Sequence, residues 1–373
     1  MNKHLVPLAL LAAVGAASAQ TSNVQIYGLI DAGYKLNRPD DVRGVSTPST
    51  RGIASGNSAG SRLGLRGSES LGSQLKAFFV LENGFLLDTG MADQGGLLLG
   101  REASVGLESA LGRISWGRIP NLSSNAGTYA MMGSIDPFLT GFDEAGAQST
   151  FAWSLYRVDN AVAFQTPVLG GFRAGALYSF NVAGAESAGS DRNTRFAGVT
   201  VNYVAGPLWS GVSIEQQQNA GSTLTDDKVV KLGINYNLGV IKPYLGWSRA
   251  RGAHRIGDNF SLVGTDVAST STLAGLTAPL AGGVLQASWQ KLDGDPVRLA
   301  GLTSAQSFGR TVAAIGYEYP LSRRTALWGV FSRSQGEGAL DADATLALGA
   351  DAAKDALKLV NRNTLQVGMR MVF

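Results

Sequence analysis

The last ten residues of the sequence, 364–373, alternate in character. Every odd position is apolar, and the even positions carry Thr, Gln, Gly and Arg before Val372. Because successive side chains of a strand point to opposite faces, such a segment presents one face to an apolar phase and the other to water. The same alternation recurs along the chain in segments of about ten residues, which favours a closed barrel in an outer membrane over a packed soluble core.

Composition narrows the fold class further. After the first 20 residues, no apolar run approaches the roughly 18 to 20 residues that a spanning helix needs, which excludes a helical membrane protein. Gly accounts for 49 of 373 residues, well above the usual level, as in barrel walls built from small residues. The absence of Cys fits an oxidising periplasm, and a formal charge of +3 is too small to indicate nucleic-acid binding.

Residues 1–19 have the features of an export signal. Lys3 and His4 form a short basic start, residues 5–17 are mostly apolar, and Ala17-Ser18-Ala19 is an A-x-A cleavage site before Gln20. We therefore expect a cleaved signal peptide over 1–19 and a single barrel domain over 20–373.

The alternation predicts an all-β fold, a transmembrane antiparallel barrel of 16 strands. Short connections alternate with long polar ones, the pattern of short periplasmic turns and long extracellular loops. The expected strands lie near residues 24–34, 60–67, 73–84, 99–108, 112–119, 156–166, 172–182, 193–205, 209–219, 228–238, 240–250, 270–280, 282–292, 308–320, 323–334 and 362–373.

One long connection, residues 120–155, is the candidate for a constriction loop. A barrel of this size leaves an aqueous lumen, so selectivity requires a narrow point. If the loop folds into the lumen, its acids Asp136, Asp143 and Glu144 face the wall, and basic wall side chains set up a transverse field. Asp143 and Glu144 are preferred as pore acids because Asp136, before Pro137, also has the pattern of a turn initiator.

A set of motifs in the mature chain resembles the trimeric general porins of Gram-negative bacteria. These motifs are NVQIYGLIDAG (23–33), GSRLGLRGSESLG (60–72), LKAFFVLENGF (75–85), GREASVGL (100–107), LGRISWGR (111–118), DPF (136–138), RVDNAV (157–162) and the terminal Phe373. The resemblance implies passive diffusion of small hydrophilic solutes and ions through a homotrimer among outer-membrane lipids, with the third loop of each protomer constricting its pore.

By motif position, the resemblance also identifies Arg62, Arg101 and Arg157 as wall arginines that face this loop. Strand parity supports Arg62, which opposes Leu63, and Arg157. Arg101 shares the parity of Val105 and other apolar residues, which conflicts with a luminal position. Three arginines against two or three loop acids predict weak anion selectivity.

Two lysines also lie on the expected luminal face. Lys35 shares a face with Asp31, and Lys76 shares one with Glu82. Both lysines are expected to pair with acids rather than to extend the basic wall.

Three alternatives remain. The first is a substrate-specific channel for small anionic solutes such as carboxylates or phosphate, preferred over sugars because inward aromatics are sparse. The second is a barrel enzyme, but a Ser-His-acid set would depend on His254, the only histidine of the mature chain. No nucleotide motif and no cluster with metal-ligand spacing is present, so no enzymatic activity, cofactor or metal is expected. The third is a structural or adhesive barrel with a plugged lumen.

Overall fold

The computed structural model describes most of the chain. The residues described are 22–40, 48–139, 141–151, 155–189, 192–221, 226–252, 255–256, 260–261, 267–297, 306–338 and 361–373. The expected signal peptide (1–19) and His254 lie outside these residues.

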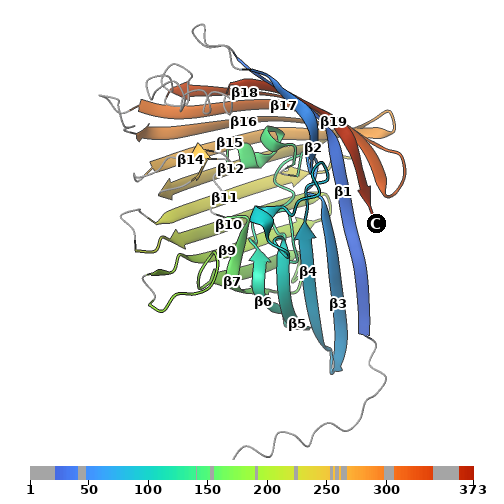
Figure 1. The fold of residues 1–373 in the computed structure, drawn as a ribbon, viewed down its shortest axis with the longest axis vertical. Coiled ribbons are helices and arrows are strands. Elements are labelled where there is room, and N and C mark those ends of the chain that lie inside the picture. Colours follow the sequence, from blue (N-terminus) through green and yellow to red (C-terminus); the bar gives the residue numbers. More distant parts are fainter. Residues whose placement is uncertain are drawn as a thin grey trace, which may run out of the picture.

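A single antiparallel sheet closes on itself because the last strand, β19, pairs with the first, β1, along 29–39. Figure 1 shows the resulting cylinder, with β1 and β19 side by side. Among the described residues, the wall has sixteen strand positions, one of which two strands share, and this confirms the expected fold. The wall strands are β1 (Ser22–Pro39), β3 (Arg62–Gly72), β4 (Leu75–Gly84), β5 (Glu102–Ser109), β6 (Gly112–Pro120), β7 (Arg157–Gln165), β8 (Phe172–Ser179), β9 (Arg195–Ala205), β10 (Leu208–Gln218), β11 (Asp227–Tyr236), β12 (Lys242–Gly252), β15 (Val267–Leu280), β16 (Gly283–Val297), β17 (Gln306–Pro320), β18 (Thr325–Gly338) and β19 (Arg362–Val372).

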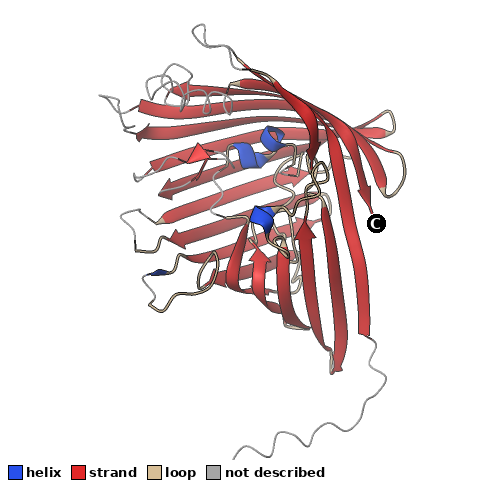
Figure 2. Cartoon of the chain, viewed as in Figure 1, coloured by secondary structure: helices blue, strands red, loops and turns tan. Residues whose placement is uncertain are grey.

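The remaining elements are short, and all of them except β2 (Thr50–Ser55) lie in the loops. Figure 2 shows short helical turns inside the ring of strands. These elements are β2 (Thr50–Ser55), β13 (Arg255–Ile256), β14 (Phe260–Ser261), and the 3-10 turns η1 (Gln94–Gly96), η2 (Asp143–Ala145) and η3 (Ala147–Ser149). Among the described residues, no helix is long and apolar enough to cross a membrane.

Along one edge of β1, two strands, β2 and β3, together fill the place of a single wall strand. β1 pairs with β3 up to Leu29↔Arg62 and with β2 from Ala32↔Ser55 onward. The chain therefore leaves the sheet between β2 and β3 over residues 56–61. The sequence predicted one loop over this whole region, and β2 was not expected.

Short turns lie at one end of the barrel, together with the start of β1 and the end of β19, as the alternating connection lengths predicted. The turn between β3 and β4 illustrates their geometry. Its two residues, Ser73 and Gln74, have φ values of 48° and 65°. Two successive left-handed residues match the right-handed twist of the flanking strands in a tight hairpin.

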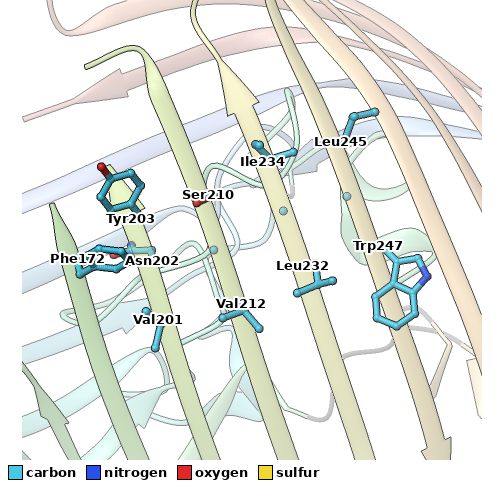
Figure 3. Close-up of a pocket in the computed structure, with 13 residues that line it drawn as sticks. Phe172, Val201, Asn202, Tyr203, Ser210, Val212, Leu232, Ile234, Leu245 and Trp247 are labelled. Atoms are coloured by element: carbon cyan, nitrogen blue, oxygen red, sulfur yellow. The ribbon is translucent and has the colours of Figure 1, made fainter. Parts of the chain in front are cut away.

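The two faces of the wall follow the predicted parity. On β11, Leu232 and Ile234 are exposed on the outer face, whereas Lys231 and Asn235 are buried on the inner face. A shallow hollow of about 440 Å³ lies on the outside of β8 to β12. Figure 3 shows the apolar side chains that line it, among them Leu232 of β11 and Trp247 of the neighbouring strand β12. Its lining residues carry no charge, so we assign it to the lipid-facing wall and not to the site.

Candidate functional site

The described residues of the connection between β6 and β7, which are 121–139, 141–151 and 155–156, run inside the barrel and are called the luminal loop below. Polar side chains of the wall hold its backbone. The Asn235 amide donates to Ser134 O at 2.7 Å, and the Ser271 hydroxyl donates to Thr150 O at 2.7 Å. These bonds satisfy carbonyls that would otherwise be buried without partners. The loop is thereby fixed along the inner face of the wall, opposite its own exit from β6.

Apolar side chains of the luminal loop fit into the wall at glycines. A Cβ atom on Gly211 would lie 2.5 Å from Met132 Sδ, and one on Gly275 would lie 2.8 Å from Pro137 Cγ. A larger wall residue would therefore collide with the loop. Some of the many glycines of the chain thus leave room on the inner wall for the side chains of this loop.

Aromatic side chains on the inner wall are more numerous than the sequence predicted. Trp209, Tyr244 and Trp328 are buried on the inner face beneath the luminal loop. The expectation that inward aromatics are sparse is wrong. These rings do not form a path for solutes, because the loop covers them.

Glu144, in η2, anchors the second half of the luminal loop. Its side chain is only 3% exposed, and it forms ion pairs with Arg362 of β19 and Arg310 of β17. Thr364 Oγ1 also donates to Glu144 Oε2 at 3.1 Å. A carboxylate held in this way packs against the wall and has almost no contact with luminal solvent.

Asp136 closes a turn within the loop. It is fully buried, and its carboxylate accepts the backbone N–H groups of Phe138 at 2.8 Å and Ala147 at 3.3 Å. The bond to the residue two positions later is the Asx-turn arrangement that the Asp-Pro sequence suggested.

A buried ion pair holds the beginning of the luminal loop. Lys231 Nζ lies 3.0 Å from Glu215 Oε1 and donates to Ser123 Oγ at 2.9 Å, and both charged side chains have no exposed area. Lys231 of β11 and Glu215 of β10 both point from the wall into the lumen. Their contact with the loop is a tertiary pairing that the sequence did not predict.

The structure brings Arg62, Arg101 and Arg157 together with Asp143. All four line one cavity of about 320 Å³ between the wall and the luminal loop, called the constriction cavity below. Arg101 Nε lies 2.6 Å from Glu82 Oε1. Within the described part of the chain, neither Arg62 nor Arg157 forms an ion pair; Arg157 Nε donates to Arg101 O at 3.0 Å.

Asp143 is the one of the three predicted acids that lines this cavity. Its side chain is 43% exposed and pairs with Lys35 of β1. The expectation that Lys35 pairs with an acid is therefore correct, although the partner is on the loop and not Asp31.

The parity conflict at Arg101 disappears in the structure. Val105 is exposed on the outer face of β5, and Ser104 is buried on the inner face. Arg101 precedes the strand and lies in a bend, so the alternation of β5 does not extend to it. Its side chain turns inward to Glu82.

Residues 56–61 form a second lip of the constriction cavity. Their backbone joins the loop to the wall: Phe142 N donates to Asn57 O at 2.5 Å, and Ser58 N donates to Asp31 Oδ1 at 3.2 Å. Arg370 Nη1 donates to Ser58 Oγ at 3.0 Å. This lip was not predicted from the sequence. The pattern that could have predicted it is the alternation of apolar and polar residues before and after residues 56–61. Together these two stretches resemble one strand that six residues interrupt.

The pairing expected for Lys76 is wrong. Glu82 is already occupied by Arg101 and by the Tyr27 hydroxyl, which donates to Glu82 Oε2 at 2.9 Å. Lys76 is exposed and has no ion pair with any residue that the structure describes.

The molecule is thus a membrane-spanning barrel whose water-filled lumen is narrowed by an inserted loop and lined at that point by fixed charges. Such an arrangement selects solutes by size and charge. Within the described ranges, no group of three or more His, Cys, Asp or Glu side chains is placed to hold a metal ion.

The sequence matches the Gram-negative porin family over residues 8–339, and the chain belongs to this family. It is 34% identical to an outer membrane porin protein of Bordetella pertussis, covering 94% of this chain and 98% of that one. It is 32% identical to outer membrane porin protein 32 of Delftia acidovorans over the full length of both. Among solved structures, the fold is similar to that of an anion-selective porin from Comamonas acidovorans, with a TM-score of 0.70, 24% identity, and coverage of 95% of this chain and 100% of that chain. The barrel thus lies in the outer membrane and forms a channel for passive diffusion.

Proposed function

We propose that this channel passes small hydrophilic solutes and ions with a weak preference for anions. Arg62, Arg101 and Arg157 form the basic side of the constriction, and Asp143 is the acid of the luminal loop that faces it. The observation that carries the proposal is the excess of positive charge in the constriction cavity, where two of the three arginines have no ion-pair partner among the described residues.

Electrostatics at this point favour anions for two reasons. Guanidinium groups stay protonated at any physiological pH, so the positive charge is permanent. Asp143 is partly neutralised by Lys35, and Glu144, the neighbouring acid, is occupied by Arg310 and Arg362. The loop therefore offers little negative charge to passing ions. The description of the similar Comamonas structure as an anion-selective porin agrees with this proposal.

The protein is also proposed to act as a homotrimer. The motifs between residues 23 and 162 resemble those of trimeric porins. The outer face of β1 supports an interface, because Val24 and Ile26 project outward and are exposed in the single chain.

The anion preference predicts a defined zero-current potential. Purified protein in a planar bilayer is placed in a tenfold KCl gradient, and the potential at zero current is measured. We expect a value between zero and the equilibrium potential of chloride. A potential on the potassium side of zero would contradict the proposed selectivity.

A further inference from the structure

A second cavity, of about 470 Å³, lies inside the barrel on the turn side of the luminal loop and is called the turn-side cavity below. The loop forms its roof through Gly127 and Thr128. Its floor and walls come from strands near their turn ends. Its charged, amide and aromatic lining includes Gln25, Arg66, Lys76, Phe78, Glu108 and Arg113.

Positive charge dominates this cavity. Arg113 Nε donates to Glu108 Oε2 at 2.8 Å, so one cation is balanced. Arg66 donates only to the neutral Gln25, at 3.0 Å, and Lys76 has no ion pair in the described part of the chain. Both side chains are exposed to the lumen. Two uncompensated cations thus face the same space.

Aromatic rings hold the guanidinium groups in place. Arg66 lies over the Tyr27 ring at 5.0 Å from its centroid, and Arg113 lies over the Phe78 ring at 5.2 Å. Such cation–π contacts limit the positions of these long side chains. Phe78 also gives the cavity an apolar surface next to its charges.

Strand register fixes the position of this cavity relative to the constriction cavity. Lys76 pairs with Glu108, and Glu108 pairs with Arg113, so these residues form one row across β4, β5 and β6. Arg66 is four residues from Arg62 on the same face of β3. At the rise of a β-strand, that spacing is about 13 Å. The two cavities are therefore separate positions along one path.

We propose that the turn-side cavity is a second anion-binding site, selective for small carboxylates that carry an apolar group. Arg66 and Lys76 bind the carboxylate, and Phe78 contacts the apolar body. Charge-assisted hydrogen bonds supply the main attraction. This inference rests on the proposed anion channel, because it assumes that anions pass the constriction cavity and reach this second binding site.

The test uses benzoate as the probe. Chloride current through the purified channel is recorded in planar bilayers while benzoate is added to one side and then to the other. We expect a saturable reduction of the current that is stronger from the turn side. The double variant Arg66→Gln/Lys76→Gln should raise the half-blocking concentration at least about tenfold, since hydrogen bonds to charged groups are lost.

Matched variants separate the parts of the proposal. Phe78→Ala should weaken the block by benzoate and leave any weaker block by acetate unchanged. Arg324→Gln removes a cation from an exposed turn at the same end of the barrel, outside the cavity, and should leave the benzoate block unchanged. Lys76→Gln alone, at an exposed side chain, provides the test if the double variant does not fold.

A current that falls linearly with benzoate concentration, without saturation, would refute the proposed binding site. Equal block of the wild type and the double variant would refute it as well. Either result leaves the proposed function intact if the zero-current potential in KCl still lies on the chloride side. A potential on the potassium side would instead refute the anion channel itself.

Discussion

Replacing Arg62, Arg101 and Arg157 together by glutamine is expected to convert the channel from weak anion preference to cation preference. The constriction cavity would then retain Asp143, with its partner Lys35 and the carboxylate of Glu82 just behind the lining. At about 4 Å in water, two unit charges interact by about 1 kcal/mol, so loss of three charges changes the chloride-to-potassium permeability ratio by about tenfold or more. The zero-current potential in a KCl gradient measures this shift.

The matched control keeps the positive charge at the three positions and changes the shape of the side chains. Lysine at the same three positions preserves the positive field but not the planar guanidinium geometry. We therefore expect the lysine variant to remain on the chloride side of zero. If the glutamine variant also stays there, the three arginines do not set the selectivity. High-salt conductance close to that of wild type shows that both variants form open channels.

The second large effect is expected for Glu144→Gln, at the anchor of the luminal loop. The substitution leaves the guanidinium groups of Arg310 and Arg362 buried without the carboxylate that they share. Removing one partner of a buried ion pair costs about 3 to 5 kcal/mol. The free energy of unfolding, measured by urea denaturation in lipid vesicles through tryptophan fluorescence, should fall by this amount. A loosened loop should also increase the noise of the open-channel current.

Asp143→Asn, one residue earlier, is the control for this prediction. Its side chain is 43% exposed and its partner Lys35 is partly exposed, so the pair contributes at most about 1 kcal/mol. This variant should unfold like wild type and show a stronger preference for chloride. Equal stability of Glu144→Gln and wild type would contradict the anchoring role of Glu144.

The wall of the barrel could be predicted from the sequence because strand parity is a local property. Leu232 and Lys231 are neighbours with opposite character, and one residue of offset places them on opposite faces. The short turns and their alternation with long loops are also local. Arg101 shows the limit of parity, since a bend before β5 separates it from the alternation that follows.

The interior of the barrel could not be predicted in the same way, because its contacts join distant parts of the chain. Glu144 reaches Arg310 and Arg362, and no pattern in the sequence indicates that pairing. Lys76 shares a face with Glu82, but Arg101 and Tyr27 compete for the same carboxylate and occupy it. The arginines of the constriction were placed by their motifs, and the structure adds that they line one cavity with Asp143.

If water and ions pass the luminal loop through an open lumen, the purified protein conducts ions, and its single-channel conductance measures this passage. Purified protein is inserted into a planar bilayer, and the current is recorded at increasing KCl concentrations. We expect stable steps whose conductance rises nearly in proportion to salt, with closure in three equal sub-steps at high voltage, one for each protomer of the proposed trimer. A correctly folded protein that gives no conductance steps would contradict an open channel.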